Sequence, residues 1–181
     1  MFQVDINKRV KKKTIIGPGF SLRVPESFVS QREDDPQEEW GYGEFFHTNT
    51  SDPDSDPQTN VFFFYWEKSK GELSKKKAGE FIKTICKEKV FNGEHSIERD
   101  EIFSVTFKRF PSFILKYRFS HHDPEAAGKA SFFVINNTRL EKVFVLGTVI
   151  ETVGSKMIEN ETMAWIEDQV INSFRFRKNT G

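Results

Sequence analysis

The sequence has little cysteine, no long apolar run and no net charge, and each absence excludes a class of protein. With Cys86 as its one cysteine, the chain cannot build an internal disulfide framework or a zinc site from several thiols. No segment approaches the roughly 20 consecutive apolar residues of a membrane-spanning helix. Because 27 basic residues balance 27 acidic ones, the chain lacks the overall charge that attracts nucleic acid or anionic membranes.

These absences lead to expectations about partners and location. We expect no transmembrane segment and no nucleic-acid partner. A cytoplasmic location is favoured for the chain as given, and a periplasmic protein or a lipoprotein is the alternative if a leader was removed.

Large aromatic side chains supply much of the apolar content. The 181 residues include 20 phenylalanines, although 36 % of the residues are hydrophobic and 30 % are charged. A chain of this length suits one domain, and a few strands rich in phenylalanine can form its core. We expect a polar N-terminal lead-in at residues 1–16, one domain over residues 17–177 and a tail at residues 178–181.

The first third of the chain predicts three strands separated by polar loops. Residues 20–24 alternate apolar and polar side chains, which is typical of a strand with one buried face. Residues 40–48 predict a second strand, although two glycines weaken the pattern. Residues 61–66 are all apolar, as expected of a central strand buried on both faces. Loops are predicted at the acidic residues 29–39 and at residues 47–60.

The rest of the chain predicts two amphipathic helices and two hairpins. Apolar residues at helical spacing favour one helix over residues 73–89, with Cys86 on its buried side, and a closing helix over residues 161–173. Between them we expect a hairpin with its turn at Phe110-Pro111-Ser112 and another with its turn at residues 136–139.

The order of these elements predicts the fold class. Consecutive strands indicate a mainly antiparallel sheet, and a strand buried on both faces requires a covering layer on each side. We therefore predict an α+β fold, an α/β/α sandwich whose central sheet has helices on both faces.

The strongest charge asymmetry lies in the first third of the chain. Residues 26–56 contain ten acidic residues and one arginine, a local charge of −9. Aromatic residues lie beside these acids, and the combination suits a protein interface in which rings anchor a partner and charge selects it. The alternative is that the rings belong to the core and the acids are only solvated. The candidate partner-binding residues are Glu33, Asp34, Asp35, Glu38, Glu39, Trp40 and Tyr42.

Three aspartates at alternate positions resemble the first half of a calcium-binding loop. They are Asp52, Asp54 and Asp56. Such a loop requires a glycine at its sixth position and a glutamate at its twelfth, where this chain has Pro57 and Phe63. We interpret the aspartates as part of a solvated loop.

A second cluster also has the residue types of metal ligands. His121, His122 and Asp123 follow one another, and His47 or His95 could complete a site. Adjacent residues at the end of a strand point to opposite sides, so we interpret the cluster as polar residues at a strand end. A metal-dependent hydrolase or metal-binding protein using these residues is the alternative.

Two short motifs carry a resemblance to a known family. GFSLRVPESF at residues 19–28 resembles the opening strand of the PsbP-like superfamily, and AWIEDQVINSFRF at residues 164–176 is similar to its last helix. This superfamily includes the photosystem II subunit PsbP, DcrB-type lipoproteins, type VI secretion effector chaperones and the eukaryotic Ran-release factor. The resemblance spans residues 17–177 and implies an antiparallel sheet between helices. It also implies a non-enzymatic role as an adaptor, chaperone or assembly factor.

REDDPQEEW at residues 32–40 is loosely similar to an acidic region of the Ran-release factor. The Gly-Gly-Ala start and the full Arg-x-x-Pro-Asp motif of that factor are absent, so the resemblance assigns no specific contacts.

The sequence as a whole favours a non-enzymatic protein-binding module that uses its acidic region as part of its surface. No catalytic constellation is evident, and no catalytic residue or cofactor is predicted. A carrier of a small apolar ligand, held among the phenylalanines, is a further alternative.

Overall fold

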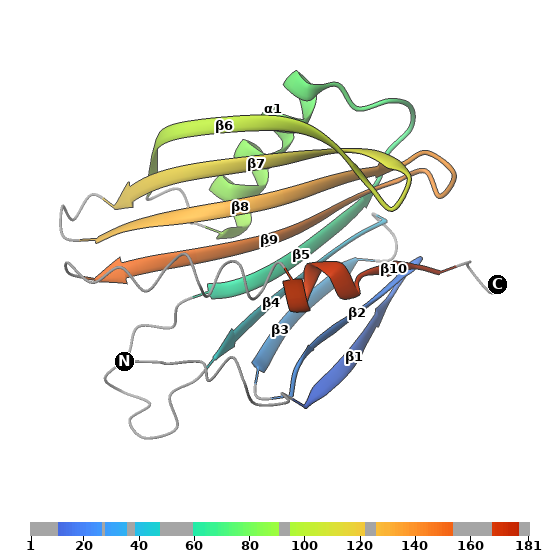
Figure 1. Cartoon of the computed structure of the whole chain (residues 1–181), viewed down its shortest axis with the longest axis horizontal. Helices are drawn as coiled ribbons and strands as arrows, with labels where there is room; N and C mark the ends of the chain where they lie inside the picture. Colours follow the sequence, from blue (N-terminus) through green and yellow to red (C-terminus); the bar gives the residue numbers. More distant parts are fainter. Residues whose placement is uncertain are drawn as a thin grey trace.

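Within the described residues the fold consists of two antiparallel sheets and one long helix, and the larger sheet is curled (Figure 1). The computed structural model describes residues 11–26, 28–35, 39–47, 60–90, 95–121, 126–153 and 168–177. The larger sheet has the strand order β3-β4-β5-β9-β8-β7-β6, and the smaller one has the order β1-β2-β10. The strands are β1 Lys12–Gly17, β2 Phe20–Pro25, β3 Phe28–Asp35, β4 Trp40–His47, β5 Asn60–Lys68, β6 His95–Phe107, β7 Phe110–His121, β8 Ala126–Asn137, β9 Lys142–Val153 and β10 Arg175–Phe176.

All described strand pairs are antiparallel, which confirms the predicted direction of the sheet. Within the described residues no helix is long and apolar enough to cross a membrane.

The helix α1, Lys75–Ile85, continues into a π-helical turn at Cys86–Val90, which confirms the helix predicted over residues 73–89. Its start is fixed by Ser74, whose side-chain oxygen accepts a hydrogen bond from the backbone nitrogen of Lys77 at 3.3 Å. Such a cap satisfies one of the backbone N–H groups that lack a partner at a helix start.

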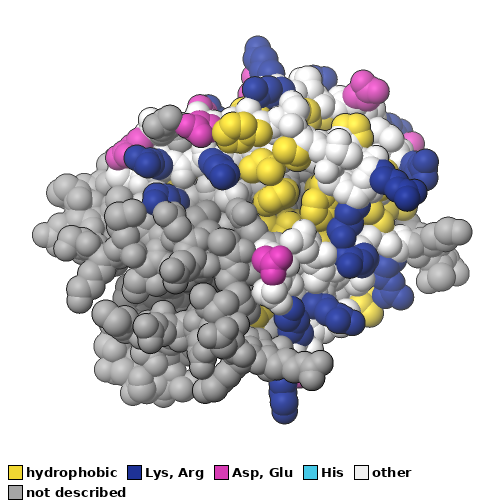
Figure 2. Space-filling model, viewed as in Figure 1, with side chains coloured by type: hydrophobic (Ala, Val, Ile, Leu, Met, Phe, Trp, Pro, Cys, Tyr) yellow, Lys and Arg dark blue, Asp and Glu magenta, His cyan; other side chains and the backbone are white. Residues whose placement is uncertain are grey.

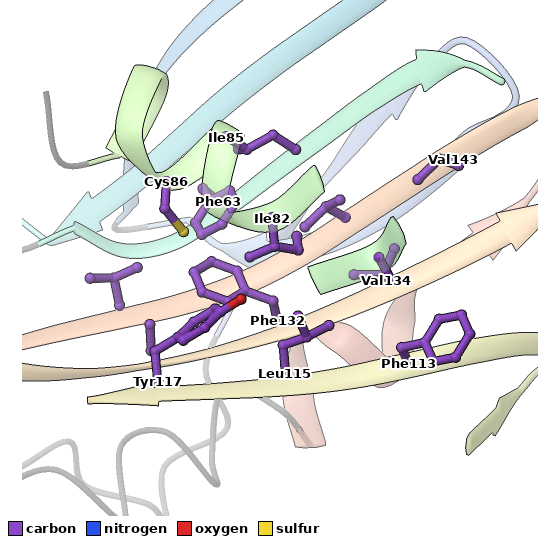
Figure 3. Packing of buried hydrophobic residues seen from close by; sticks show 14 of the residues in the cluster. Phe63, Ile82, Ile85, Cys86, Phe113, Leu115, Tyr117, Phe132, Val134 and Val143 are labelled. Carbon is purple, nitrogen blue, oxygen red and sulfur yellow. The ribbon is translucent and has the colours of Figure 1, made fainter. Parts of the chain in front are cut away.

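The apolar side of α1 packs on one face of the larger sheet and forms the first hydrophobic core. Figure 3 shows Ile82 and Cys86 facing Phe63, Phe132 and Tyr117 of the sheet. The rings of Phe63 and Phe132 lie 5.1 Å apart. Burial of each large side chain contributes roughly 1.5–3 kcal/mol, so this core holds the helix on the sheet.

The opposite face of the larger sheet is covered by the smaller sheet and by residues 170–174. Phe20 of β2 packs edge-on against Phe64 of β5 and Phe144 of β9, with ring centroids 5.3 and 5.8 Å apart. Phe174 stacks on Phe20 at 5.7 Å. This second core includes Leu22, Val24, Val170 and Ile171.

The α+β class is confirmed, while the described residues do not show helices on both faces of the sheet as the predicted α/β/α sandwich requires. In the part of the chain that the structure describes, a three-stranded sheet with short helical turns covers this face. The closing helix predicted over residues 161–173 lies partly outside the described residues. A 3₁₀ turn at Ile171–Ser173 ends its described part. Asp168 and Gln169 before this turn are helical, and pairing of Arg175 with Ser21 after it draws the chain into strand β10.

The central strand β5 is buried on both faces, as predicted for residues 61–66. Phe63 faces the α1 core, while Phe62 and Phe64 face the second core. The ring of Phe64 lies over its cross-strand partner Gly43, where an added Cβ would come within 2.4 Å of the ring. Such an aromatic ring over a glycine stabilises a sheet, which explains why β4 forms despite its glycines.

Strand β3 replaces the loop predicted at residues 29–39, so that prediction is wrong. Its eight residues pair with β4 from Phe28 with His47 to Asp35 with Trp40. Charged residues are tolerated in the end strand of a sheet because its outer side is not occupied by another strand. Strand β1 was also missed, and it uses residues from the predicted N-terminal lead-in. The predicted domain boundaries stay predictions.

The turn between β6 and β7 lies at Lys108 and Arg109 and not at the predicted Phe110-Pro111-Ser112. Both turn residues have positive φ angles, 49° and 73°, as a two-residue hairpin turn of type I′ requires. Pro111 lies inside β7 opposite Thr106, and the described pairing of β7 with β8 begins only at Ser112. The missing N–H of Pro111 therefore breaks no described bond to β8.

The second predicted hairpin is confirmed as a pair of strands, β8 with β9, but its turn lies at residues 138–141 and not at 136–139, since Asn137 still pairs with Lys142. The side-chain oxygen of Asn137 accepts hydrogen bonds from the backbone nitrogens of Arg139 and Leu140, each at 3.1 Å.

Candidate functional site

The acidic segment forms the end strand of the larger sheet. Among the described strands β3 pairs with β4 alone. In this register Glu33 is the partner of Tyr42, Asp34 of Gly41 and Asp35 of Trp40. The acidic positions therefore lie together at the end of β3 that leads into the turn toward β4.

An ion pair fixes this turn to the neighbouring strand. The Nζ atom of Lys68 lies 2.7 Å from a carboxylate oxygen of Glu39, and both side chains are about half exposed. The backbone nitrogen of Lys68 also donates to the Glu39 carbonyl oxygen at 3.0 Å. The hydrogen bond to Glu39 raises the pKa of Lys68. Glu39 has a positive φ of 57°, which marks the point where the chain reverses between β3 and β4.

A half-buried aromatic pair lies beside the turn. The Trp40 ring stacks on the Tyr65 ring, with centroids 6.4 Å apart and planes at 18°. The Tyr65 hydroxyl donates a hydrogen bond to Glu67 at 2.7 Å. Burial raises the pKa of the Glu67 carboxyl, and the hydrogen bond from Tyr65 partly opposes that effect. Trp40 therefore combines a held ring with partial exposure, which suits an anchor for a partner.

The structure separates the seven candidate residues. Glu33, Asp34 and Asp35 lie on β3, and Glu39 and Trp40 lie at the turn, so the strand and the turn bring these five positions together. Tyr42 is 7 % exposed and belongs to the core under α1, which corresponds to the core alternative for this ring. Glu38 lies outside the described residues.

The histidine cluster is only partly described. Backbone pairing places His95 directly opposite His121 at the ends of β6 and β7. His47 ends β4, which three strands separate from β7, so about 19 Å of sheet lies between them at roughly 4.8 Å per strand. His122 and Asp123 lie outside the described residues. No group of three possible metal ligands occurs among the residues that were placed.

The aspartates of the second acidic loop, Asp52, Asp54 and Asp56, also lie outside the described ranges. Cys86 is buried, as its place on the helix predicted, and burial raises the pKa of its thiol. A buried thiol of raised pKa is a poor nucleophile because the thiolate is the reactive form.

A second surface was not found from the sequence. On the face opposite α1, Phe103 of β6 pairs with Ile114 of β7, and Ile114 pairs with Phe133 of β8. Phe103 is 46 % exposed, although the same row of the sheet continues into the buried Leu146 and Phe64. The alternation of apolar residues predicted the strand, but it cannot show how far the covering layer extends.

Comparison with known proteins supports the fold. No family model and no curated protein matches the chain. Among solved structures, the cyanobacterial PsbP protein CyanoP from Synechocystis is similar, with a TM-score of 0.59 and 14 % identity over 98 % of this chain and 99 % of that one. The Saccharomyces cerevisiae Ran-binding protein Mog1p matches with a TM-score of 0.51 and 12 % identity, over 92 % of this chain and 96 % of its own. A mutant of Mog1 also gives 0.51, with 11 % identity over 96 % and 98 %. At such identities the likeness shows the fold alone.

Proposed function

We propose that this chain, which has the PsbP-like fold, is a non-enzymatic protein-binding module that uses the β3–β4 edge as a partner surface. This edge is defined by Glu33, Asp34, Asp35, Glu39 and Trp40. The observation that carries the proposal is the position of β3. The acids lie on an end strand of the sheet and lead into a turn beside a half-buried tryptophan.

The chemistry of the edge indicates the kind of partner. Carboxylates attract and orient a basic surface, while an aromatic ring supplies contact area at the centre of an interface. Charged residues also keep an end strand from pairing with a second copy of itself. We therefore propose a partner protein with a basic surface. The proposed role is that of an adaptor, chaperone or assembly factor, since each of these acts by binding and needs no catalytic residue.

The similar proteins agree with this proposal. One of them, Mog1p, is named as a Ran-binding protein, so the fold occurs in a protein that binds another protein. Ran itself is not proposed as the partner here, since the fold is the extent of the likeness.

Charge reversal with a matched control tests the proposal. The test variant changes the four acids of the edge, Glu33, Asp34, Asp35 and Glu39, to lysine. The control variant changes four exposed acids elsewhere, Glu72, Glu80, Glu88 and Glu98, to lysine. Both variants change the net charge by the same amount, so any general effect of charge appears in both.

Each variant and the wild type would be used to capture partners from cells that produce the protein, with quantitative mass spectrometry. We expect at least one protein to be recovered with the wild type and the control variant but not with the edge variant. Equal recovery by all three chains would remove the acids from the interface. Thermal unfolding of the variants shows whether each has folded.

A further inference from the structure

On the face of the larger sheet opposite α1, the described residues leave a strip of apolar side chains partly exposed. We define the β6–β8 strip as Phe103, Val105, Ile114 and Phe133. Phe103, Ile114 and Phe133 form one row across three strands. Phe103 is 46 % exposed, and the other three side chains are partly exposed. Figure 2 shows this apolar surface as a patch over β6, β7 and β8.

The covering layer ends at one side of this strip. Phe107 of β6 packs against Phe174 of the covering layer at 6.3 Å and against Phe133 at 6.0 Å. Phe110 contacts Phe176 at 4.7 Å. The described part of the layer thus reaches the hairpin end of β6 and β7 and does not extend over the middle of these strands. The row of the strip runs from the buried Leu146 of β9 and reaches the surface at Phe103 of β6.

Along the direction of the strands, positive charge lies at both ends of the strip. Lys116 and Arg118 are exposed and follow Ile114 on the same face of β7, because strand residues two apart share a face. At the other end Lys108 lies 5.3 Å from the centre of the Phe107 ring, and Arg109 follows it in the turn. Figure 2 shows blue side chains on both sides of the apolar patch.

Two neighbouring groups modify this charge. Glu101 is the cross-strand partner of Lys116 and is the acid nearest to that end of the strip in the described register. Arg175 lies close enough to Lys108 to add to the effect of partial burial, and both lower the pKa of Lys108. Among the described residues the cations therefore outnumber the acids at both ends.

We propose that the β6–β8 strip docks an acidic segment of a partner protein, with apolar anchors that lie on Phe103, Ile114 and Phe133. Three strands span about 10 Å, close to the 10–12 Å diameter of an α-helix. An amphipathic helix can bury its apolar stripe on the strip while its acidic residues meet the cations at the two ends. The strip lies in the middle of strands and not on a protruding loop, which favours a narrow segment over a flat membrane surface.

This surface differs from the β3–β4 edge in place and chemistry. β6 and β3 are the two opposite end strands of the larger sheet. The edge is acidic and selects a basic partner, whereas the strip is apolar with cations and selects an acidic one. Failure of one proposal therefore leaves the other standing.

A displayed library of random peptides, each about four helical turns long, provides the probe. The library would be selected on the wild-type protein and tested against three variants. Phe103→Ser removes the most exposed ring of the strip. Lys116→Glu with Arg118→Glu reverses the charge at one end while leaving the strip intact. Ile16→Ser is the matched control, because Ile16 is the other large exposed hydrophobic side chain among the described residues, at 57 % exposure, and lies on β1.

We expect the enriched peptides to be acidic, with apolar residues three and four apart. Their affinity should fall about tenfold or more with Phe103→Ser, as for a central interface ring. It should also fall with the charge reversal and with added salt, and it should not change with Ile16→Ser. Hydrogen exchange of the bound wild type should slow in β6 and β7.

Four results would overturn the proposal. They are no enriched peptide, enriched peptides that are basic, enriched peptides that bind Phe103→Ser as tightly as the wild type, and a wild-type dimer in sedimentation that Phe103→Ser dissociates. The last result would assign the strip to a second copy of this chain. Because the charge-reversal variant changes exposed side chains alone, it still tests the proposal if Phe103→Ser fails to fold.

Discussion

Gly147→Ala tests how tightly the core under α1 is packed. Gly147 of β9 lies between its partners Phe63 of β5 and Phe132 of β8. A Cβ at this position would come within 2.3 Å of the Phe63 ring and 2.6 Å of the Phe132 ring, whereas ordinary contact begins at 3.4 Å. At least one ring would have to move by about 1 Å inside a close-packed core.

The size of the effect follows from two opposing contributions. Overpacking of a core costs about 1–3 kcal/mol, and replacing glycine by alanine returns about 0.5–1 kcal/mol of backbone entropy. We expect the free energy of unfolding to fall by about 1–2 kcal/mol, which lowers the melting temperature by about 2–8 °C. Urea unfolding followed by tryptophan fluorescence, with calorimetry, measures both quantities.

Gly79→Ala is the matched control within the same core. A Cβ there meets only the Cδ1 atom of Ile102, at 2.9 Å, which is the end of a flexible side chain. The gain in helix propensity, about 0.5–1 kcal/mol, should offset this contact, so we expect little change. A Gly147→Ala protein as stable as the wild type would refute the packing of Phe63 and Phe132 over the glycine.

Three further predictions concern buried hydroxyls, alkaline pH and metal ions. Thr148→Val should raise the free energy of unfolding by about 1 kcal/mol, because the buried Thr148 hydroxyl has no hydrogen-bond partner among the described residues; a loss in urea unfolding would contradict this. Burial raises the pKa of Cys86 above its usual 9.0 and also raises that of Tyr117, so the folded chain keeps protons that the unfolded chain releases. Stability should therefore be complete below about pH 8 and fall by about pH 10, and Cys86→Ala should reduce the fall; equal stability at both pH values would argue against these burials. Zn²⁺ and Ca²⁺ should leave the melting temperature unchanged, and a rise abolished by His121→Ala would instead support the metal-binding alternative.

The sequence predicts the elements that have a strong internal pattern. The unbroken apolar run in β5 fits a strand that is buried on both faces. The helical spacing of apolar residues in α1 fits a helix that is buried on one side. The Asn-Asn-Thr-Arg stretch at residues 136–139 predicts a hairpin between β8 and β9, although Asn136 and Asn137 still belong to β8 and the turn begins at residue 138.

The errors arise where a contact distant in sequence decides the structure. β3 forms because β4 offers it a hydrogen-bonded partner, although its own residues are those of a loop. The turn at Lys108 and Arg109 adopts positive φ angles that its residue types do not favour, while the packing of Phe107 on Phe174 holds the hairpin end in place. The described second layer includes a sheet that the sequence did not predict, because β10 near the end of the chain pairs with β2 near its start.

The same distinction between local pattern and distant contact applies to the candidate site residues. The acidic composition of the β3–β4 edge is visible in the sequence, but the burial of Tyr42 depends on α1, which lies over it. The exposure of the β6–β8 strip cannot be predicted from its alternating strand pattern. Whether Phe103 is exposed or buried depends on the position of the covering layer.

The binding affinity of a captured partner for the edge variant tests the central claim most directly. Isothermal titration calorimetry would compare the wild type, the variant with Glu33, Asp34, Asp35 and Glu39 changed to lysine, and the control variant with the four distant acids changed. We predict that the edge variant binds about a hundredfold or more weakly, since several charge pairs of about 1 kcal/mol each are lost or reversed, while the control binds as the wild type does. Equal affinity of all three chains would contradict the assignment of the β3–β4 edge as the partner surface.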